Sequence, residues 1–254
     1  MLAAGPRECT DGAPLLAGFD EPVLRTWAIG DYRGPLRRIV VDWKTGRCGH
    51  LRRSLPAAGR GAGARLWPHV ADAISGTTLL VVPAPSGPAR RRHGMLVAAE
   101  LADAVAAGMA DASSGRVAAA SENGLAGLLP RDADASSGRV AAAPENGLAG
   151  TPSGDAGATS APPVARPLHV ASVDLLRRAG GPARQRGSSA RGRVANRSRA
   201  PVLRASVPTG TAVLLVDDVV TTGATLAACA GALRAAGAVV VGALVVAGAP
   251  APGR

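Results

Sequence analysis

The residues best suited to chemistry lie in one short stretch near the end of the chain. Asp217 and Asp218 follow the apolar residues 213–216, and soon after them comes the turn Thr221-Thr222-Gly223-Ala224-Thr225. Threonine hydroxyls and the free N–H groups at the start of a helix can bind phosphate oxygens, and glycine lets the backbone approach closely. Two adjacent carboxylates can accept hydrogen bonds from a sugar diol or help to hold Mg²⁺. The pattern therefore predicts a site for a ribose 5-phosphate.

The elements around this stretch predict an α/β fold. Residues 212–216 are fully apolar and predict a buried strand, and a helix is expected from about Ala224 to Ala236, with Gly237 as its stop. Another strand is expected over 239–246. Strand, helix and strand with continuous apolar runs are typical of a mostly parallel sheet flanked by helices. Ligands bind such sheets at the carboxyl ends of the strands, where the two carboxylates stand.

A second strand end lies upstream. Residues 79–82 are apolar and predict a buried strand that ends in the rigid segment Pro83-Ala84-Pro85-Ser86. Arg90, Arg91 and Arg92 follow, and guanidinium groups suit phosphate oxygens. Residues 94–108 then place apolar side chains four apart, which predicts a helix with an apolar stripe.

The stretch 213–225 strongly resembles the 5-phosphoribosyl-1-pyrophosphate (PRPP) motif of type I phosphoribosyltransferases. It lacks the Gly-Lys-Ser/Thr of a Walker loop and the three spaced glycines of a dinucleotide-binding loop. Other segments resemble the ComF family of these proteins, and the resemblance covers about 25–109 and 168–249. The segments concerned are 32–40 with 43–46, 81–86 with 90–94, and 175–178 with Gln185, Ser189, Arg193 and Asn196.

The resemblance implies a type I phosphoribosyltransferase-like fold and the transfer of phosphoribose from Mg²⁺–PRPP to a nitrogen acceptor, with release of pyrophosphate. It implies that residues 221–225 bind the 5-phosphate, and that Asp217 and Asp218 act as catalytic residues at the ribose hydroxyls or as Mg²⁺ ligands. Arg193 and Asn196 are candidates from a loop near the substrate. The pyrophosphate side would comprise Pro83, Ala84, Pro85, Ser86, Arg90, Arg91, Arg92 and Lys44.

The chain departs from the ComF pattern after Arg92. The family usually continues Arg-Gly-Phe-Asn-Gln, whereas this sequence reads Arg92-His93-Gly94-Met95-Leu96 and so lacks the aromatic residue and the two amides. An alternative function therefore stays open, namely a non-catalytic PRPP-binding regulator or an accessory protein of competence and DNA uptake. Binding of PRPP without turnover would favour that alternative.

Composition shifts divide the chain. Seventeen residues starting at Asp111 recur from Asp134, at an offset of 23, with one mismatch, and a duplication inside a low-complexity insertion explains this better than a solenoid. The predicted organisation is an irregular amino-terminal arm over 1–24, two parts of one phosphoribosyltransferase domain over 25–110 and 167–249, a linker over 111–166, and a tail over 250–254.

The charge balance suggests an anionic ligand. The formal net charge is +11, and residues 177–204 hold nine arginines and no acidic residue. Binding to a nucleic-acid backbone needs only such charge, but single strands also need stacking aromatics, and none lies in this stretch. Nucleic-acid binding is therefore the less favoured alternative, and a homodimer stays open. Three cysteines without a secretory leader favour a cytoplasmic protein, and the apolar runs are too short for a membrane span.

Overall fold

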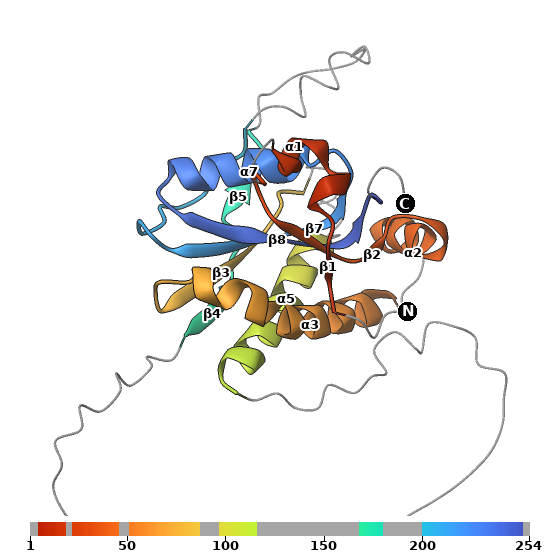
Figure 1. Ribbon diagram of the computed structural model, residues 1–254, viewed down its shortest axis with the longest axis horizontal. Coiled ribbons are helices and arrows are strands. Elements are labelled where there is room, and N and C mark those ends of the chain that lie inside the picture. Colours follow the sequence, from red (N-terminus) through yellow and green to blue (C-terminus); the bar gives the residue numbers. More distant parts are fainter. Residues whose placement is uncertain are drawn as a thin grey trace, which may run out of the picture.

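One twisted sheet runs through the middle of the protein, and helices cover both of its faces (Figure 1). The computed structural model describes residues 5–18, 22–45, 51–86, 97–115, 168–179 and 200–250. Within them, the six-stranded sheet has the order β1-β2-β8-β7-β3-β4, and every neighbouring pair is parallel except β1 with β2. Its strands are β1 (Arg7–Glu8), β2 (Thr26–Asp31), β3 (Thr78–Pro83), β4 (His169–Ser172), β7 (Ala212–Val220) and β8 (Val239–Gly248).

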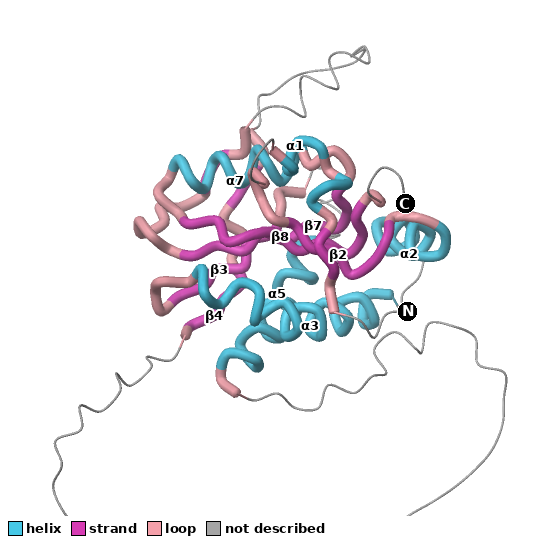
Figure 2. Tube along the Cα trace, viewed as in Figure 1, coloured by secondary structure: helices cyan, strands magenta, loops and turns pink. Residues whose placement is uncertain are grey.

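The helices form the two outer layers (Figure 2). One face of the sheet carries α1 (Pro14–Ala17) and α7 (Ala224–Ala235), and the other carries α2 (Gly34–Thr45), α3 (Leu51–Val70) and α5 (Val97–Ser113). Short 3₁₀ turns, η1 (Thr10–Gly12) and η2 (Ala71–Ala73), and a hairpin of β5 (Leu176–Arg177) with β6 (Val202–Leu203) complete the described elements. The predicted fold class, a mostly parallel sheet flanked by helices, is confirmed.

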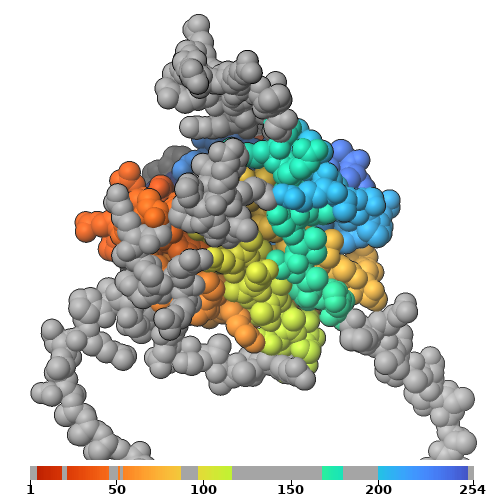
Figure 3. Space-filling view, turned by 180° about the vertical axis from the view of Figure 1, so that it is seen from behind, coloured from red at the N-terminus to blue at the C-terminus, as the bar shows by residue number. Residues whose placement is uncertain are grey.

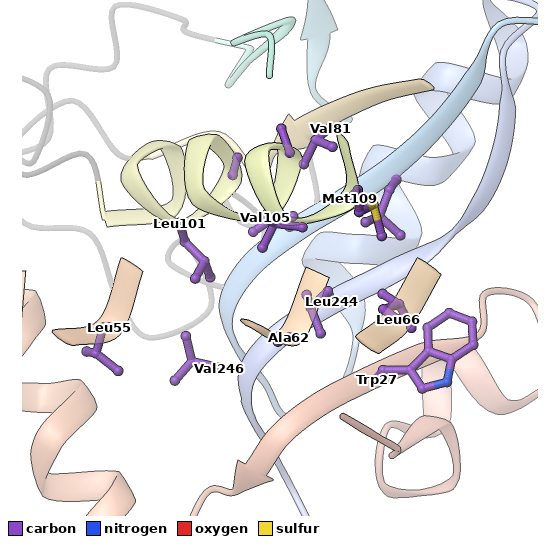
Figure 4. Packing of buried hydrophobic residues seen from close by; sticks show 14 of the residues in the cluster. Trp27, Leu55, Ala62, Leu66, Val81, Leu101, Val105, Met109, Leu244 and Val246 are labelled. Atoms are coloured by element: carbon purple, nitrogen blue, oxygen red, sulfur yellow. The ribbon is translucent and has the colours of Figure 1, made fainter. Parts of the chain in front are cut away.

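The core between the sheet and the helices α2, α3 and α5 is built mainly from aliphatic side chains, together with Trp27, Trp43 and Met109. Figure 4 shows side chains of α3 and α5 meeting those of β2, β3 and β8, among them Leu66, Val105 and Leu244, which are fully buried. Helices α3 and α5 pack closely because a glycine of each helix faces the backbone of the other helix. A Cβ added to Gly63 would lie 2.5 Å from the carbonyl oxygen of Val105, and one added to Gly108 would overlap the carbonyl oxygen of Arg60.

Strand β7 separates two apolar clusters because its side chains alternate between the faces. Leu214 and Val216 belong to the cluster beneath α2, α3 and α5, whereas Val213 and Leu215 belong to the cluster beneath α1 and α7. All four are fully buried. This two-sided burial explains why residues 212–216 of the strand form an uninterrupted apolar run rather than an alternating one.

The first 24 residues, predicted to be an irregular arm, contain β1, η1 and α1. The Cys9 N–H donates to the carbonyl of Thr26 (2.8 Å), and the Thr26 N–H donates to Oγ1 of Thr10 (3.0 Å). Leu16 is fully buried against the α7 face. Elements of two to four residues leave no periodic pattern in a sequence, so only these tertiary contacts define them.

The predicted linker lies mostly outside the described residues, which resume at Leu168 after Gly115. Helix α5 extends to Ser113, three residues into the predicted linker, and β4 begins at His169. Figure 3 shows α5 and residues 168–179 side by side on the back of the molecule. Within the described residues, no helix has both the length and the apolar character needed to cross a bilayer.

Candidate functional site

The candidate residues meet at the carboxyl ends of β3 and β7, which are neighbouring parallel strands. Pro83, the last residue of β3, pairs with Val216, so β7 continues past its neighbour through the two aspartates. The Ala84 N–H donates to the carbonyl of Val216 (2.8 Å) and fixes the segment Pro83-Ala84-Pro85-Ser86, here called the 83–86 loop, beside the acidic pair. The first three residues of this loop are buried, and Ser86 is half-buried.

The turn 221–225, here called the phosphate turn, leads from β7 into α7. Gly223 caps the helix with φ of 82°, a left-handed conformation that favours glycine. The Ala224 N–H donates weakly to Oγ1 of Thr222 (3.4 Å), and the Ala227 N–H donates to the carbonyl of Gly223 (2.9 Å). The backbone N–H groups in the first turn of an α-helix have no carbonyl partner within the helix, so they can donate to a ligand. A pocket lies directly at this helix start, lined by Asp217, Val219, Val220, Thr221, Thr222, Gly223, Ala224, Thr225 and Leu226.

Asp217 is the carboxylate that lines this pocket. It continues the row of Val213 and Leu215 toward α7 and is half-buried. Loss of water around the carboxyl, followed by repulsion from Asp218, raises the pKa of Asp217 to about 7. The Asp218 N–H, which donates to Oδ1 of Asp217 (2.8 Å), and the charge of Lys44 act in the opposite direction.

Asp218 has different surroundings. Its Oδ1 lies 2.8 Å from Nζ of Lys44, which comes from the last turn of α2 on the opposite side of the sheet. Both side chains are largely buried, with 10% of Asp218 and 20% of Lys44 exposed. The structure thus brings Lys44 to the acidic pair, whereas the sequence analysis grouped it with the pyrophosphate side.

Arg178 is a site candidate that sequence reasoning did not select. It follows β5, and its Nε donates to the carbonyl of Pro85 in the 83–86 loop (3.1 Å), 93 residues away in sequence. It also lies near Cys229, whose pKa is raised to about 12 by burial and by the charge of Asp217, against the charge of Arg178. The available sequence signal was the segment 175–178, but Arg178 was one of nine arginines in 177–204 and had no feature that distinguished it from the others.

Five predicted residues lie outside the described residues, namely Arg90, Arg91, Arg92, Arg193 and Asn196. Within the described residues, no three His, Cys, Asp or Glu side chains gather as a metal site would require.

Comparison with known protein families agrees with this geometry. Residues 155–253 match the family model described as "Phosphoribosyl transferase domain", a match that covers less than half of the chain and includes β7, the phosphate turn, α7 and β8. The fold described above is consistent with the type I phosphoribosyltransferase architecture. Searches of curated proteins and of solved structures found no match.

Proposed function

We propose that this protein is a ComF-like phosphoribosyltransferase that binds Mg²⁺–PRPP and transfers its phosphoribosyl group to a nitrogen acceptor, with release of pyrophosphate. The observation that carries the proposal is the joint placement of Asp217 and the phosphate turn around one pocket, within the segment that matches the phosphoribosyl transferase domain. Free N–H groups and threonine hydroxyls suit a phosphate, and a carboxylate beside them suits the hydroxyls of the attached ribose.

The ribose would be oriented mainly by Asp217. Oδ1 of Asp218 is engaged by Lys44 on the α2 side of the sheet, whereas Asp217 lines the pocket. An ionised Asp217 accepts hydrogen bonds from ribose hydroxyls, and the half-buried position strengthens those bonds relative to water. In this proposal Asp218 and Lys44 hold the end of β7 in place, and Asp217 contacts the sugar.

The pyrophosphate would bind between the 83–86 loop and the nearby arginines. Arg178 contacts the loop through Nε, which donates to the carbonyl of Pro85 (3.1 Å) and leaves the Nη groups outside this hydrogen bond. Its two Nη groups are therefore suited to an anion beside Pro85. Arg90, Arg91 and Arg92 belong to the same proposal on the basis of their sequence position, as do Arg193 and Asn196 near the substrate.

Mg²⁺ is expected to arrive with the pyrophosphate oxygens, and Asp217 is the described carboxylate that fits as an additional ligand. When bound, the ion would neutralise negative charge on the departing pyrophosphate. The protein's own contribution would be positional: the phosphate turn holds one end of the substrate and Arg178 the other. Departure of pyrophosphate leaves positive charge at C1 of the ribose, which the nitrogen acceptor then attacks. No side-chain nucleophile is required. The proposal includes a cytoplasmic location, which the free thiols of Cys9 and Cys229 support.

Calorimetric titration with PRPP, with and without Mg²⁺, tests the binding step. We expect binding that is stronger with Mg²⁺, followed by pyrophosphate release when a suitable nitrogen acceptor is added. Binding without turnover across a broad panel of acceptors would favour the regulator alternative. The absence of any PRPP binding would contradict both functions.

Two arginine variants test the pyrophosphate side. Arg178→Met removes the guanidinium that contacts Pro85, and we expect about tenfold weaker binding of inorganic pyrophosphate, the loss of one charge-assisted contact. Arg204→Met is the matched control, because Arg204 follows the partner strand β6 and pairs with Asp174 at 3.5 Å instead. Equal affinities in the two variants would remove Arg178 from the site.

A further inference from the structure

We infer that residues 13–16 of the amino-terminal arm are part of the phosphate site, with Leu15 and Leu16 as positioning residues that fix the direction of the Gly223 N–H. This inference rests on the proposed function, because it concerns how the phosphate turn is held. It extends the site to a part of the chain outside the segment that matches the phosphoribosyl transferase domain.

The first contact is a backbone hydrogen bond. The Leu15 N–H donates to the carbonyl of Thr222 (3.1 Å), the residue before Gly223. In a trans peptide the C=O and the following N–H point in opposite directions. Anchoring the Thr222 carbonyl on the arm therefore turns the Gly223 N–H away from the arm, whose residues do not line the pocket.

This restraint matters because the peptide could otherwise turn over. Gly223 has φ of 82°, and glycine accepts conformations on both sides of φ = 0 at little cost. A reversed Thr222–Gly223 peptide would present a carbonyl oxygen to the bound anion instead of an N–H donor. A phosphate turn that contains glycine thus needs an external contact to keep its donors directed at the ligand, and Leu15 supplies one.

The second contact is steric. Leu16 is fully buried and packs directly on Gly223, since a Cβ added to this glycine would overlap Cγ of the leucine. The leucine side chain therefore supports the turn from behind. Helices α1 and α7 are in contact at this position (Figure 1).

The arm is itself anchored to the sheet, so it can act as a support. Hydrogen bonds join Cys9 and Thr10 to Thr26 of β2 at 2.8 and 3.0 Å. At the carboxyl end of β7, directly before the turn, the Ala249 N–H donates to the carbonyl of Val220 (2.9 Å). The phosphate turn is thus restrained both by the end of β8 and by the arm.

A pair of leucine variants separates this role from general stability. Leu16→Ala and Leu233→Ala each remove a fully buried leucine from the same apolar cluster, but only Leu16 contacts the phosphate turn. The probes are ribose 5-phosphate and inorganic pyrophosphate, measured by calorimetry, with thermal unfolding as the measure of stability. We expect Leu16→Ala to weaken ribose 5-phosphate binding about tenfold, with pyrophosphate binding unchanged and both affinities unchanged in Leu233→Ala.

A second pair keeps the test decisive if Leu16→Ala does not fold. Leu15→Pro removes the N–H donor at the second position of α1, where proline is tolerated because the first turn lacks internal partners. Leu15→Ala keeps the donor and removes only a side chain that is 54% exposed. We expect weaker ribose 5-phosphate binding in Leu15→Pro than in Leu15→Ala.

The outcomes distinguish the two proposals. Wild-type protein that binds neither PRPP nor ribose 5-phosphate would overturn the proposed function, and this inference with it. Wild-type protein that binds both, together with folded Leu15→Pro or Leu16→Ala variants of unchanged affinity, would overturn the inference alone.

Discussion

The two carboxylates of the acidic pair, Asp217 and Asp218, have different surroundings. Asp218 is held by Lys44 at 2.8 Å, whereas Asp217 lines the pocket and carries a pKa raised to about 7. The difference arises because successive residues of a strand point to opposite faces of the sheet, and each face offers a different neighbour. The two aspartates should therefore respond differently to substitution.

Single substitutions of the pair test this difference. We expect Asp217→Asn to weaken Mg²⁺–PRPP binding about tenfold without loss of stability, since a neutral amide replaces a carboxylate that is costly to ionise. We expect Asp218→Asn to lower the free energy of unfolding by about 1–3 kcal/mol, because it leaves the Lys44 ammonium without its partner. Urea unfolding and calorimetry measure the two effects.

The exposed Asp72→Asn serves as a control that should change neither quantity. Lys44→Met in the Asp218→Asn background should recover part of the lost stability, because the unpaired charge is then removed. Unchanged PRPP affinity in Asp217→Asn would contradict the assignment of this carboxylate to the site.

The raised pKa of Asp217 also predicts how stability depends on pH. Its value rises from 3.8 to about 7 on folding, so between these limits the folded chain binds more protons than the unfolded chain. The free energy of unfolding of the unliganded protein should therefore fall as pH rises through this range, with a contribution of up to about 1.4 kcal/mol per pH unit from this group. Urea unfolding from pH 4 to pH 8 measures the slope. In Asp217→Asn the free energy of unfolding should depend less steeply on pH than in the wild-type protein. Identical pH dependences in the two proteins would show that the carboxyl of Asp217 titrates normally.

Among the elements, α3 shows how tertiary packing can override local preference. Local propensity disfavours a helix over 51–70, because Pro56 and Pro68 and several glycines are poor helix formers. The structure has a helix there because Gly59 and Gly63 allow α5 to approach the backbone closely, which compensates for the weak propensity. The α3–α5 layer supports β3 and β7, whose ends carry the candidate site.

This packing predicts a strong effect of a single methyl group. Gly108→Ala should lower the free energy of unfolding by about 2 kcal/mol, because the new Cβ overlaps the Arg60 carbonyl and forces the helices apart. Gly231→Ala is the matched control in α7, since nothing lies within 4 Å of the added Cβ. That variant should be neutral or more stable by up to about 1 kcal/mol. Equal unfolding midpoints in urea would contradict the close packing of α3 on α5.

At the scale of the whole molecule, the chain returns to the sheet after the low-complexity segment. Helix α5 ends at Ser113, and β4 begins at His169 beside β3. Helix α5 is in contact with β4, so the two ends can be joined by a short connection of the length usual between a helix and a strand.

Replacing residues 116–166 with about six Gly and Ser residues should therefore preserve the fold. We expect the free energy of unfolding to change by less than about 1 kcal/mol, since the entropy of loop closure depends only weakly on length. Circular dichroism and urea unfolding measure this, with PRPP titration as the check on the site. Insoluble or unfolded protein would show that the inserted segment contributes to the structure.

The local part of the site could be predicted from sequence because it is contiguous. Strand β7, the phosphate turn and α7 follow one another within 212–235, so their apolar run, acids and glycine are visible together. The order of apolar runs and an intervening helix likewise indicated the α/β class, since buried parallel strands require continuous apolar runs.

Tertiary structure alone decided which distant residues meet this segment. The partners are Lys44 from α2, Arg178 beside β5 and Leu16 from the arm. Lys44 was a candidate from the family resemblance, but its pairing with Asp218 was not predicted, and Arg178 and Leu16 lie in stretches whose pattern shows only a basic or apolar residue. Each contact depends on how separate elements fold back onto the sheet. Sequence therefore determined the chemistry available at the strand end, and the packing of the layers determined which groups surround it, because contacts between distant segments leave no local pattern.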